Sequence, residues 1–477
     1  MKILHVEVAV IGAGSAGLAA YRAAEAHGKR VLLIEGGAYG TTCARVGCMP
    51  SKLLIAAAEA AHAVGDAPAF GVHGGALHID GRAVMARVRS ERDRFVSFVL
   101  DGIDKIPPEN RLQGQARFIT ANRLQVGPDT QVTAERIVIA TGSSPQVPDQ
   151  FAALGTHLLT SDDVFAWEDL PDSMAVIGSG AIGLELGQAL HRLGVRVALF
   201  GRDDRLAQLH DAAVNACAIT CLGAELDLRL RTEILSAQRD GDAVLLHSRN
   251  ADGTERSEHY RCLLAATGRS PNLDDLALDH SGLLLDEHGV PHFDAHTMQC
   301  GSSAIFIAGD VNGAPAVLHE AVDQGRIAGD NAGRYPQVQP GLRRTALAIA
   351  FTEPQIASIG CTGEQLPANG HKVGEVSFRD QGRSRVMRRN CGLLRVYGEC
   401  SSGRFLGAEI VGPRAEHLAH LLAWACQSRM TVDQMLEMPF YHPVIEEGVR
   451  TALRDLQEKL NDSVSMAEHC ADCTPGM

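Results

Sequence analysis

The chain has 477 residues, 45% hydrophobic and 21% charged, and its 44 Lys+Arg against 57 Asp+Glu give a net charge of -13. A chain of this length exceeds a single hydrophobic core, so we expect several domains. The acidic balance argues against nucleic acid or an anionic membrane surface as partners, and no apolar run is long enough to cross a bilayer.

The N-terminal segment and the cysteines indicate the compartment. A strand begins near His5, which leaves no room for a signal peptide. The 12 cysteines are scattered apart from three close pairs, at 43/48, 217/221 and 470/473, unlike the disulfide framework of a small secreted protein. We therefore expect a cytoplasmic protein.

A glycine-rich turn between two strands opens the chain. Residues 6–11, VEVAVI, predict a buried parallel strand that runs into GAGSAG, an alanine-rich helix and a second strand. In this pattern Gly12 makes the tight turn, Gly14 lets the backbone approach a pyrophosphate, and Gly17 permits close helix–strand packing. Glu35, at the end of the second strand, is positioned to bind a ribose hydroxyl. A tight turn without a ligand is the alternative, and the whole pattern favours a dinucleotide site.

Two cysteines follow this unit, in the segment GTTCARVGCMPSK at residues 40–52. If Cys48 opens a helix, the positive end of the helix dipole stabilises its thiolate, and Lys52 on the same helix face adds a positive charge. These properties suit a disulfide between Cys43 and Cys48 that opens into one nucleophilic and one charge-stabilised thiol. The alternative is a pair of buried structural thiols, because free cysteine packs as a small hydrophobe.

The segment at 40–52 resembles the active-site segment of the flavin-dependent pyridine nucleotide-disulfide oxidoreductases, which include dihydrolipoyl dehydrogenase, mercuric reductase and glutathione reductase. Its Pro-Ser-Lys ending is more similar to the first two enzymes. Thr41 stands where the family usually has a second glycine, and a modest change in loop geometry is the expected cost. The resemblance covers about residues 5–460, and it implies that the first nucleotide unit binds FAD.

The resemblance also implies further contacts with FAD. The strand around Ala116 would touch the adenine, the Ala-Thr-Gly strand end at 140–142 would lie beside the flavin, and Asp310 would bind the ribityl chain. By itself a strand end of this kind is weak evidence, and a structural loop aspartate is the alternative for Asp310. The expected FAD contacts besides the glycine motif are Glu35, Thr42, Lys52, Ala116, Thr141, Gly142, Asp310 and Leu318.

The glycine-rich pattern recurs in the second part of the chain. A strand at 174–177 is followed by GSGAIG, with Gly178, Gly180 and Gly183, then by a helix and a strand at 195–200. Two complete fingerprints in one chain predict two dinucleotides and hydride transfer between them. Gly268, in a second Ala-Thr-Gly strand end, closes this nucleotide-binding unit.

The residues after the strand at 195–200 bear on the choice of nicotinamide cofactor. Gly201 stands where NAD-binding relatives carry an acid, and Arg202 could pair with the 2′-phosphate of NADP. Asp203 and Asp204 could instead bind ribose hydroxyls or repel a phosphate, and a solvated arginine is the alternative for Arg202. We expect NADP, with NAD left open.

Glu185 matches a family glutamate that pairs with the active-site lysine, here Lys52. The resemblance implies that this ammonium stabilises the reduced, anionic flavin electrostatically. Support of the helix dipole by Glu185 is the alternative, and both can hold together.

From about Thr345 the sequence alternates between strands and helices and resembles the dimer-forming interface domain of the family, which implies a homodimer. The segment from His442 to Glu447 is similar to the His-Pro-Thr-x-x-Glu motif, with Val444 in place of threonine. A histidine can take a proton from a thiol and return it, and a carboxylate can orient the imidazole. The resemblance implies that His442 is an acid–base residue acting on the disulfide of the other subunit, with Glu447 as its partner. Mercuric reductases lack this histidine.

Two further cysteine pairs lie outside these motifs. Cys217 and Cys221 lie one helical turn apart, and buried packing is the favoured interpretation. Cys470 and Cys473, in a polar C-terminal tail, could form a redox shuttle or bind a soft metal ion, or have no role. No other metal ligands are predicted.

The sequence thus predicts an α/β protein with two Rossmann-like dinucleotide-binding domains and a C-terminal α+β dimerisation domain. The expected divisions are an FAD domain at 1–148 and 269–344, an NAD(P) domain at 149–268, an interface domain at 345–460 and a flexible tail at 461–477. Pro-Ser-Lys, His442 and His319 favour an enzyme like dihydrolipoyl dehydrogenase, acting on a lipoyl-type or other disulfide. The alternative is an NADPH-dependent disulfide or metal-ion reductase that uses Cys470 and Cys473; a metal-handling protein is the hypothesis from another class.

Overall fold

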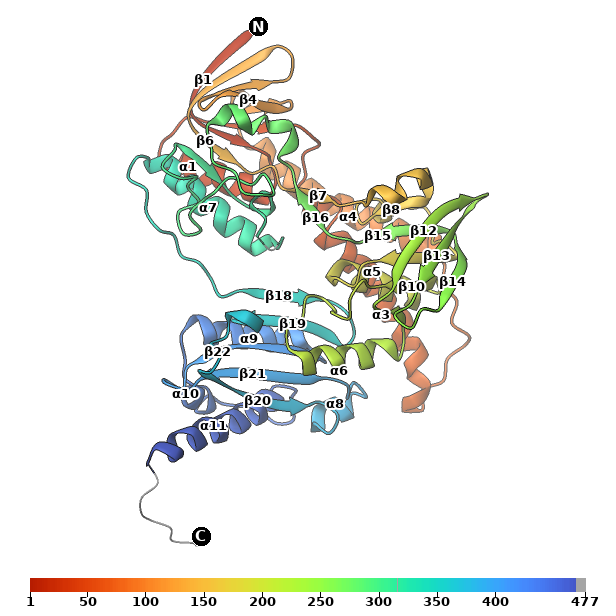
Figure 1. Ribbon diagram of the computed structural model, residues 1–477. Coiled ribbons are helices and arrows are strands. Elements are labelled where there is room, and N and C mark those ends of the chain that lie inside the picture. Colours follow the sequence, from red (N-terminus) through yellow and green to blue (C-terminus); the bar gives the residue numbers. More distant parts are fainter. Residues whose placement is uncertain (315, 469–477) are drawn as a thin grey trace. The chain divides into compact units, whose positions relative to one another are not determined.

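A computed structural model describes residues 1–314 and 316–468 (Figure 1). The chain divides into two compact units: unit 1 contains residues 1–170 and 264–343, and unit 2 contains residues 171–263 and the chain from 344 onward. The finer division into FAD, NAD(P) and interface domains remains a prediction. Cys470 and Cys473 lie outside the described residues, and helix α11 (Glu447–Glu468) continues into the segment predicted as the tail.

Unit 1 is built on a seven-stranded sheet with the order β3-β2-β1-β6-β5-β4, in which β17 also pairs with β6. Its parallel strands are β1 (Lys2–Ile11), β2 (Val31–Glu35), β3 (Arg111–Gln113), β6 (Thr130–Ile139) and β17 (Ile305–Ile307), and the antiparallel ones are β4 (Ala116–Thr120) and β5 (Arg123–Val126). In β1, Val8 and Val10 face one apolar cluster, whereas Ala9 and Ile11 face another. A strand with both faces buried must be apolar throughout, which is why VEVAVI has few polar residues.

Helices cover the sheet of unit 1. α1 (Ser15–Ala26) and α7 (Leu318–Arg334) lie side by side, and their apolar residues share a cluster with Val8 and Val10 (Figure 1). The cysteine segment forms α2 (Thr42–Arg45) and α3 (Cys48–Asp66). The next helix, α4 (Gly81–Asp104), is capped by the Asp80 side chain, which accepts a hydrogen bond from Ala83 N at 3.0 Å.

Unit 2 begins with the second nucleotide-binding fold. The parallel strands β9 (Ser173–Ile177), β10 (Arg196–Phe200) and β11 (Asp227–Arg229) alternate with α5 (Ala181–Arg192) and α6 (Ala212–Gly223). An antiparallel sheet of β12 (Glu233–Asp240), β13 (Ala243–Arg249) and β14 (Glu255–Tyr260) follows, and β15 (Cys262–Ala265) leads the chain back to unit 1. The strand–glycine–helix order predicted for both nucleotide-binding folds is confirmed.

The C-terminal part of unit 2 is an antiparallel sheet with the order β18-β19-β22-β21-β20. Its strands are β18 (Leu347–Ala350), β19 (Gln355–Gly360), β20 (His371–Ser377), β21 (Leu393–Glu399) and β22 (Phe405–Gly412). One face carries Leu394, Val396 and Ile410, which pack in one apolar cluster with α9 (Ala415–Gln427) and α11. The remaining short strands and helices are, in unit 1, β7 (Ser143–Pro145), paired with β16 (Arg269–Pro271), and β8 (Leu158–Thr160), and, in unit 2, α8 (Gly382–Val386) and α10 (Val432–Leu436).

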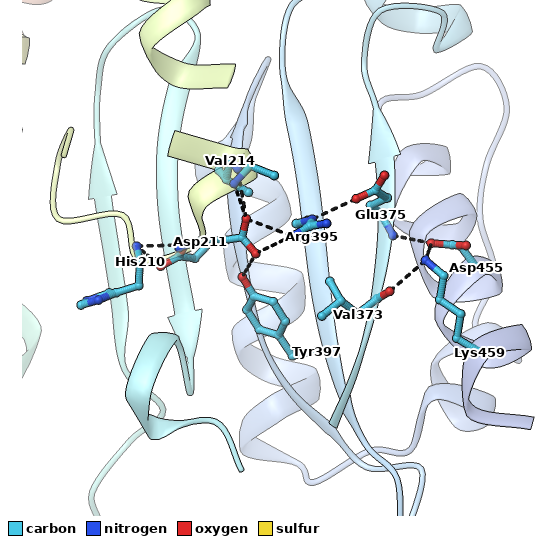
Figure 2. A network of polar contacts seen from close by, with 11 residues as sticks. His210, Asp211, Val214, Val373, Glu375, Arg395, Tyr397, Asp455 and Lys459 are labelled. Atoms are coloured by element: carbon cyan, nitrogen blue, oxygen red, sulfur yellow. Dashed lines mark hydrogen bonds and ion pairs between the residues drawn. The ribbon is translucent and has the colours of Figure 1, made fainter. Parts of the chain in front are cut away.

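Three polar residues on the other face of this sheet hold the start of α6: Arg395 and Tyr397 on β21 (Figure 2) and Glu409 on β22. Glu409 is fully buried and accepts backbone hydrogen bonds from His210 at 3.0 Å and Asp211 at 2.6 Å. Asp211 caps α6 and accepts from Arg395 Nη1 at 3.1 Å and from the Tyr397 hydroxyl at 3.2 Å. Burial and the charge of Asp211 raise the pKa of Tyr397, so the hydroxyl stays a donor. A buried carboxylate needs such partners, and here they fix the N-terminal end of α6 to the sheet.

In the described ranges, 1–314 and 316–468, the helices fall short of the combined length and hydropathy that a membrane span requires.

Candidate functional site

The glycine turn of unit 1 leaves space for a ligand beside the start of α1. Gly12 has φ +104°, and a Cβ there would lie 2.2 Å from the Ala140 carbonyl oxygen. A Cβ on Gly17 would lie 1.8 Å from the Gly12 oxygen, whereas one on Gly14 would meet no atom within 4 Å. Gly12 and Gly17 are therefore required by backbone packing. Gly14 opens onto free space at a helix N-terminus, which fits a pyrophosphate group.

Glu35 braces this turn. Its Oε2 accepts a hydrogen bond from Ala13 N and its Oε1 one from Gly37 N, both at 2.7 Å. A carboxylate oxygen has two lone pairs, so each oxygen can still accept a ribose hydroxyl. The contact with the ribose remains a prediction, and the bracing of the turn is a role that the sequence pattern did not reveal.

The other predicted FAD residues also belong to unit 1. Thr141 Oγ1 donates to Asn272 O at 2.7 Å, and Asp310 Oδ2 accepts from Ser143 Oγ at 3.1 Å. The remaining ones are Thr42 at the start of α2, Ala116 buried in β4, Gly142 at φ +70° and Leu318, exposed at the start of α7. Their contacts with FAD remain predictions.

A buried polar atom at the start of α7 also fits a ligand. His319 Nε2 is buried and has no hydrogen-bond partner among the residues that the structure describes. Such an atom is costly unless something pairs with it, so this histidine is suited to contact a polar group of a bound cofactor.

The cysteine pair lies at the junction of α2 and α3. Cys48 is the first residue of α3, which confirms that it opens a helix, and Cys43 lies in α2. The two side chains share a hydrogen bond; this bond and burial raise the pKa of the Cys43 thiol, and the charge of Lys52 acts in the opposite direction. Cys48 is exposed. The alternative of two buried structural thiols does not fit this exposure.

The residues around the pair set its geometry. Thr41 has φ +57°, a conformation that favours glycine, and its side chain accepts a hydrogen bond from Ala44 N at 3.3 Å. Thr41 therefore has an unfavourable backbone conformation, while its side chain caps the N-terminal end of α2. Lys52 Nζ donates to Ser51 Oγ at 3.4 Å, and its charge reaches Cys43.

The partner predicted for Lys52 belongs to the other unit. Glu185 is buried in α5, and its Oε1 accepts a hydrogen bond from Phe351 N at 2.8 Å, which links α5 to the end of β18. The sequence pattern did not reveal this link. The pairing of Glu185 with Lys52 remains a prediction.

The second glycine turn resembles the first. Gly178 has φ +122°, a Cβ on Gly180 would meet no atom within 4 Å, and α5 begins at the next residue. Gly183 is buried where Gly17 lies in the first turn. The free space above Gly180 fits a second pyrophosphate. Gly268, in unit 1, has φ +124°.

The two carboxylates in the loop after β10 both have partners within the protein. Asp203 Oδ1 accepts from Arg205 N at 2.9 Å. Asp204 pairs with the guanidinium of Arg231, which lowers the pKa of Asp204. Arg202 is exposed, and its guanidinium has no hydrogen bond or ion pair within the described part of the chain. The sequence pattern did not reveal Arg231, because it lies on a later turn.

His442 and Glu447 lie together in unit 2. His442 Nδ1 is 3.1 Å from both oxygens of Glu447. The His442 hydrogen bond lowers the pKa of Glu447. Val444 N and Arg450 Nη2 also donate to this carboxylate, each at 3.3 Å. The predicted pair is confirmed as a contact. The histidine side chain is 79% exposed, so Nε2 remains open to a substrate.

The interpretation of Cys221 as a packed thiol is wrong. Cys221 forms a disulfide with Cys391, and Cys217 is a half-buried free thiol. A bond across 170 positions depends on the tertiary fold, so the local spacing could not indicate it. The described residues contain no group of three or more His, Cys, Asp or Glu side chains that could hold a metal ion.

Comparisons with known proteins agree with this arrangement. The family model described as pyridine nucleotide-disulphide oxidoreductase matches residues 6–325, and the dimerisation domain of these enzymes matches residues 347–453. The second match supports a homodimer. The mercuric reductase of Shigella flexneri is 32% identical over 481 residues, 98% of this chain and 83% of that protein. Dihydrolipoyl dehydrogenase 2 of Haloarcula marismortui is 30% identical over 461 residues, 94% of this chain and 95% of that protein.

Solved structures with the same fold include two that cover nearly the whole chain. LpdA from Mycobacterium tuberculosis has a TM-score of 0.80 at 25% identity and covers 94% of this chain and 99% of its own. The HOCl-induced flavoprotein disulfide reductase RclA from Escherichia coli has a TM-score of 0.79 at 23% identity and covers 95% of this chain and 99% of its own. At 23% identity, the similarity to RclA shows a shared fold and nothing further.

Proposed function

The chain belongs to the pyridine nucleotide-disulphide oxidoreductase family, and from that premise we propose an activity like that of dihydrolipoyl dehydrogenase. It is a flavoprotein disulfide oxidoreductase of a family that binds FAD and NAD(P). Within the family, the proposed reaction moves electrons between NAD(P)(H) and a dithiol or disulfide of the lipoyl type. The observation that carries this choice is the contact between His442 Nδ1 and Glu447, at 3.1 Å, because thiol chemistry needs a group that exchanges protons.

The two cysteines divide the covalent work. Cys43 Sγ attacks a substrate disulfide: its bond to one substrate sulfur forms, the substrate S–S bond breaks, and the other sulfur leaves as a thiolate. Cys48 Sγ then attacks Cys43, which releases the second substrate thiol and forms the Cys43–Cys48 disulfide. The substrate gains two electrons and two protons, and the cysteine pair loses them. Bound FAD would supply two-electron exchange with NAD(P)(H). In the reverse direction a dihydrolipoyl group reduces the cysteine pair.

His442 handles the protons at Nε2. The hydrogen bond of Nδ1 to Glu447 fixes the imidazole orientation, and the carboxylate stabilises the imidazolium when Nε2 holds a proton. In the proposed homodimer, His442 gives this proton to the leaving thiolate at the cysteine pair of the other subunit and takes it back in the reverse reaction.

NADP is the proposed nicotinamide cofactor. Of the two carboxylates that would repel a 2′-phosphate, Asp204 pairs with the guanidinium of Arg231, which offsets its charge, and Asp203 is held by a backbone hydrogen bond from Arg205 N. The exposed Arg202 guanidinium supplies the charge that a phosphate requires.

Steady-state turnover of lipoamide and dihydrolipoamide tests the proposal. We expect turnover that is lost in Cys43→Ser and Cys48→Ser and retained in Cys262→Ser, which removes a buried free thiol. Absence of turnover with either lipoyl substrate in the FAD-loaded wild-type enzyme would contradict the proposal.

The similarity to mercuric reductase favours a second candidate, an NADPH-dependent reductase of a metal ion or of another disulfide, such as thioredoxin or glutathione, that uses the tail cysteines. It predicts NADPH oxidation that depends on Hg(II) and is lost in a Cys470→Ser/Cys473→Ser variant. Lipoamide turnover that is unchanged after deletion of residues 462–477, without Hg(II)-dependent oxidation, would favour the first candidate.

A further inference from the structure

Three cysteines of unit 2 lie in contact with one another. Cys221, on α6, is bonded to Cys391, in the loop before β21. Cys217 lies one turn earlier on α6, and its Sγ is 3.9 Å from Cys221 Sγ. The Cys217 thiol also has a hydrogen bond with the backbone of Gly392, next to Cys391. A free thiol therefore lies against a disulfide sulfur, which is the arrangement that thiol–disulfide exchange requires.

The three sulfurs differ in their access to solvent. Cys391 is exposed, Cys217 is half-buried, and Cys221 is 9% exposed. The sulfur of Cys221 is thus sheltered from solvent, and its two cysteine neighbours are the half-buried Cys217 and the exposed Cys391. The Cα separations allow a bond from Cys221 to either neighbour: Cys221 and Cys391 have Cα atoms 6.2 Å apart, and residues four apart on an α-helix have Cα atoms about 6 Å apart, within the range that disulfides span.

We propose that Cys217, Cys221 and Cys391 form a second thiol–disulfide exchange site, in which the bond moves from Cys221–Cys391 to Cys217–Cys221. The Cys217 thiolate attacks Cys221 Sγ, the Cys217–Cys221 bond forms, and the Cys221–Cys391 bond breaks. Cys391 leaves as a thiolate and takes up a proton. This proton balances the one that Cys217 lost when it formed its thiolate. The step involves no net oxidation and needs no co-reactant, and it leaves an exposed thiol at Cys391.

The exchange changes how α6 is held. The N-terminal end of α6 is fixed to β21 by the contacts of Asp211 with Arg395 and Tyr397 (Figure 2). It is also fixed to β22 by Glu409, which accepts a hydrogen bond from Asp211 N. The disulfide holds the later part of the helix to the loop before β21. Movement of the bond removes this covalent link and leaves the polar anchor intact.

The segment that immediately precedes Cys391 in the sequence indicates the chemical class of its partner. Residues 379–389 contain five arginines against one aspartate, and Arg379, Arg383, Arg385 and Arg388 are exposed. Such a segment attracts anions in a salt-dependent way. The partner is therefore an anionic low-molecular-weight disulfide: the Cys391 thiolate bonds to one of its sulfurs, and the other sulfur leaves as a thiolate.

Peptide mapping after labelling tests the exchange. The full-length oxidised protein is treated with N-ethylmaleimide without a reductant and digested without reduction. We expect two linkage isomers, one with label on Cys217 and the other with label on Cys391. Cys217→Ser should abolish the label on Cys391, whereas Cys262→Ser should behave as the wild type. If Cys217→Ser does not fold, Cys217→Ala serves in its place.

Glutathione disulfide is the probe for the partner. We expect a glutathione adduct on Cys391 in the wild type and in Cys262→Ser, formed more slowly at 1 M salt than at 0.1 M, and no adduct in Cys217→Ser. The proposal fails if Cys391 is labelled equally in Cys217→Ser, if Cys391 is never labelled, or if mild oxidation does not produce the Cys221–Cys391 bond. Because the cysteines differ from Cys43 and Cys48, lipoamide turnover is a separate measurement.

Discussion

His442 Nδ1 lies 3.1 Å from both carboxylate oxygens of Glu447. The carboxylate also accepts from Val444 N and Arg450 Nη2, each at 3.3 Å, so it is held in place while it orients the imidazole. This contact fixes the orientation of an exposed imidazole.

Glu447→Gln should lower lipoamide turnover about 10- to 100-fold, because a hydrogen bond to a charged group is lost from the imidazolium. His442→Gln should lower it about 100-fold or more. Arg450→Ala, which removes a peripheral partner of the carboxylate, is the matched control and should have a much smaller effect. An unchanged rate in Glu447→Gln would remove the carboxylate from the proposed mechanism.

The pH dependence of Glu447 has a definite sign. Its pKa is lowered from 4.5 by the His442 hydrogen bond, so its contribution to stability is fully present at neutral pH and is lost only as the pH falls through the lowered value. We therefore expect no activity change between about pH 5 and pH 8 that is assignable to this carboxyl. A titration of the Glu447 carboxyl followed by its 13C chemical shift, with a midpoint above 4.5, would contradict the lowered pKa.

Gly14→Ala and Gly17→Ala should separate cofactor binding from folding. A Cβ at Gly14 meets no atom within 4 Å of the chain, whereas a Cβ at Gly17 would overlap the Gly12 oxygen at 1.8 Å. Gly14→Ala should keep the thermal unfolding temperature of the apoprotein and lose FAD content. Gly17→Ala should destabilise the apoprotein by about 3 kcal/mol or more. Full FAD content in Gly14→Ala would show that no phosphate approaches this position.

Arg202→Ala should lower kcat/KM for NADPH about 10- to 100-fold and change that for NADH little, because one charge-assisted contact with the 2′-phosphate is removed. Arg231→Ala should shift the preference in the same direction by releasing Asp204. Arg256→Ala, at an exposed position on β14, is the control. Equal losses with both cofactors in Arg202→Ala would mean that the arginine does not distinguish them.

The isomerisation at Cys217 should accelerate with pH. Burial raises the pKa of the Cys217 thiol, and the thiolate is the nucleophile. The rate at which Cys391 becomes labelled should therefore keep rising above about pH 8.5, the range of an ordinary thiol. A plateau below that pH in time-resolved labelling would show that Cys217 is not the attacking group.

Local sequence was sufficient to determine both nucleotide folds. In each fold the strand, the glycine turn and the helix are adjacent in the chain, and their geometry depends on short-range steric limits: a Cβ on Gly12 or Gly17 would overlap backbone. The helix at Cys48 and the contact of His442 with Glu447 are local in the same sense, since a few residues separate the groups. The nearly continuous apolar run in β1 identified a strand buried on both faces.

Only the tertiary structure decided the contacts between distant segments. Four contacts join groups on separate elements: the Cys221–Cys391 disulfide, the ion pair of Asp204 with Arg231, and the hydrogen bonds of Glu409 with Asp211 N and of Glu185 with Phe351 N. Residue types indicate which groups can pair, but the packing of sheets and helices decides which of them meet. The physical reason is that a covalent or polar contact acts over a few ångströms, whereas sequence patterns report only neighbours along the chain.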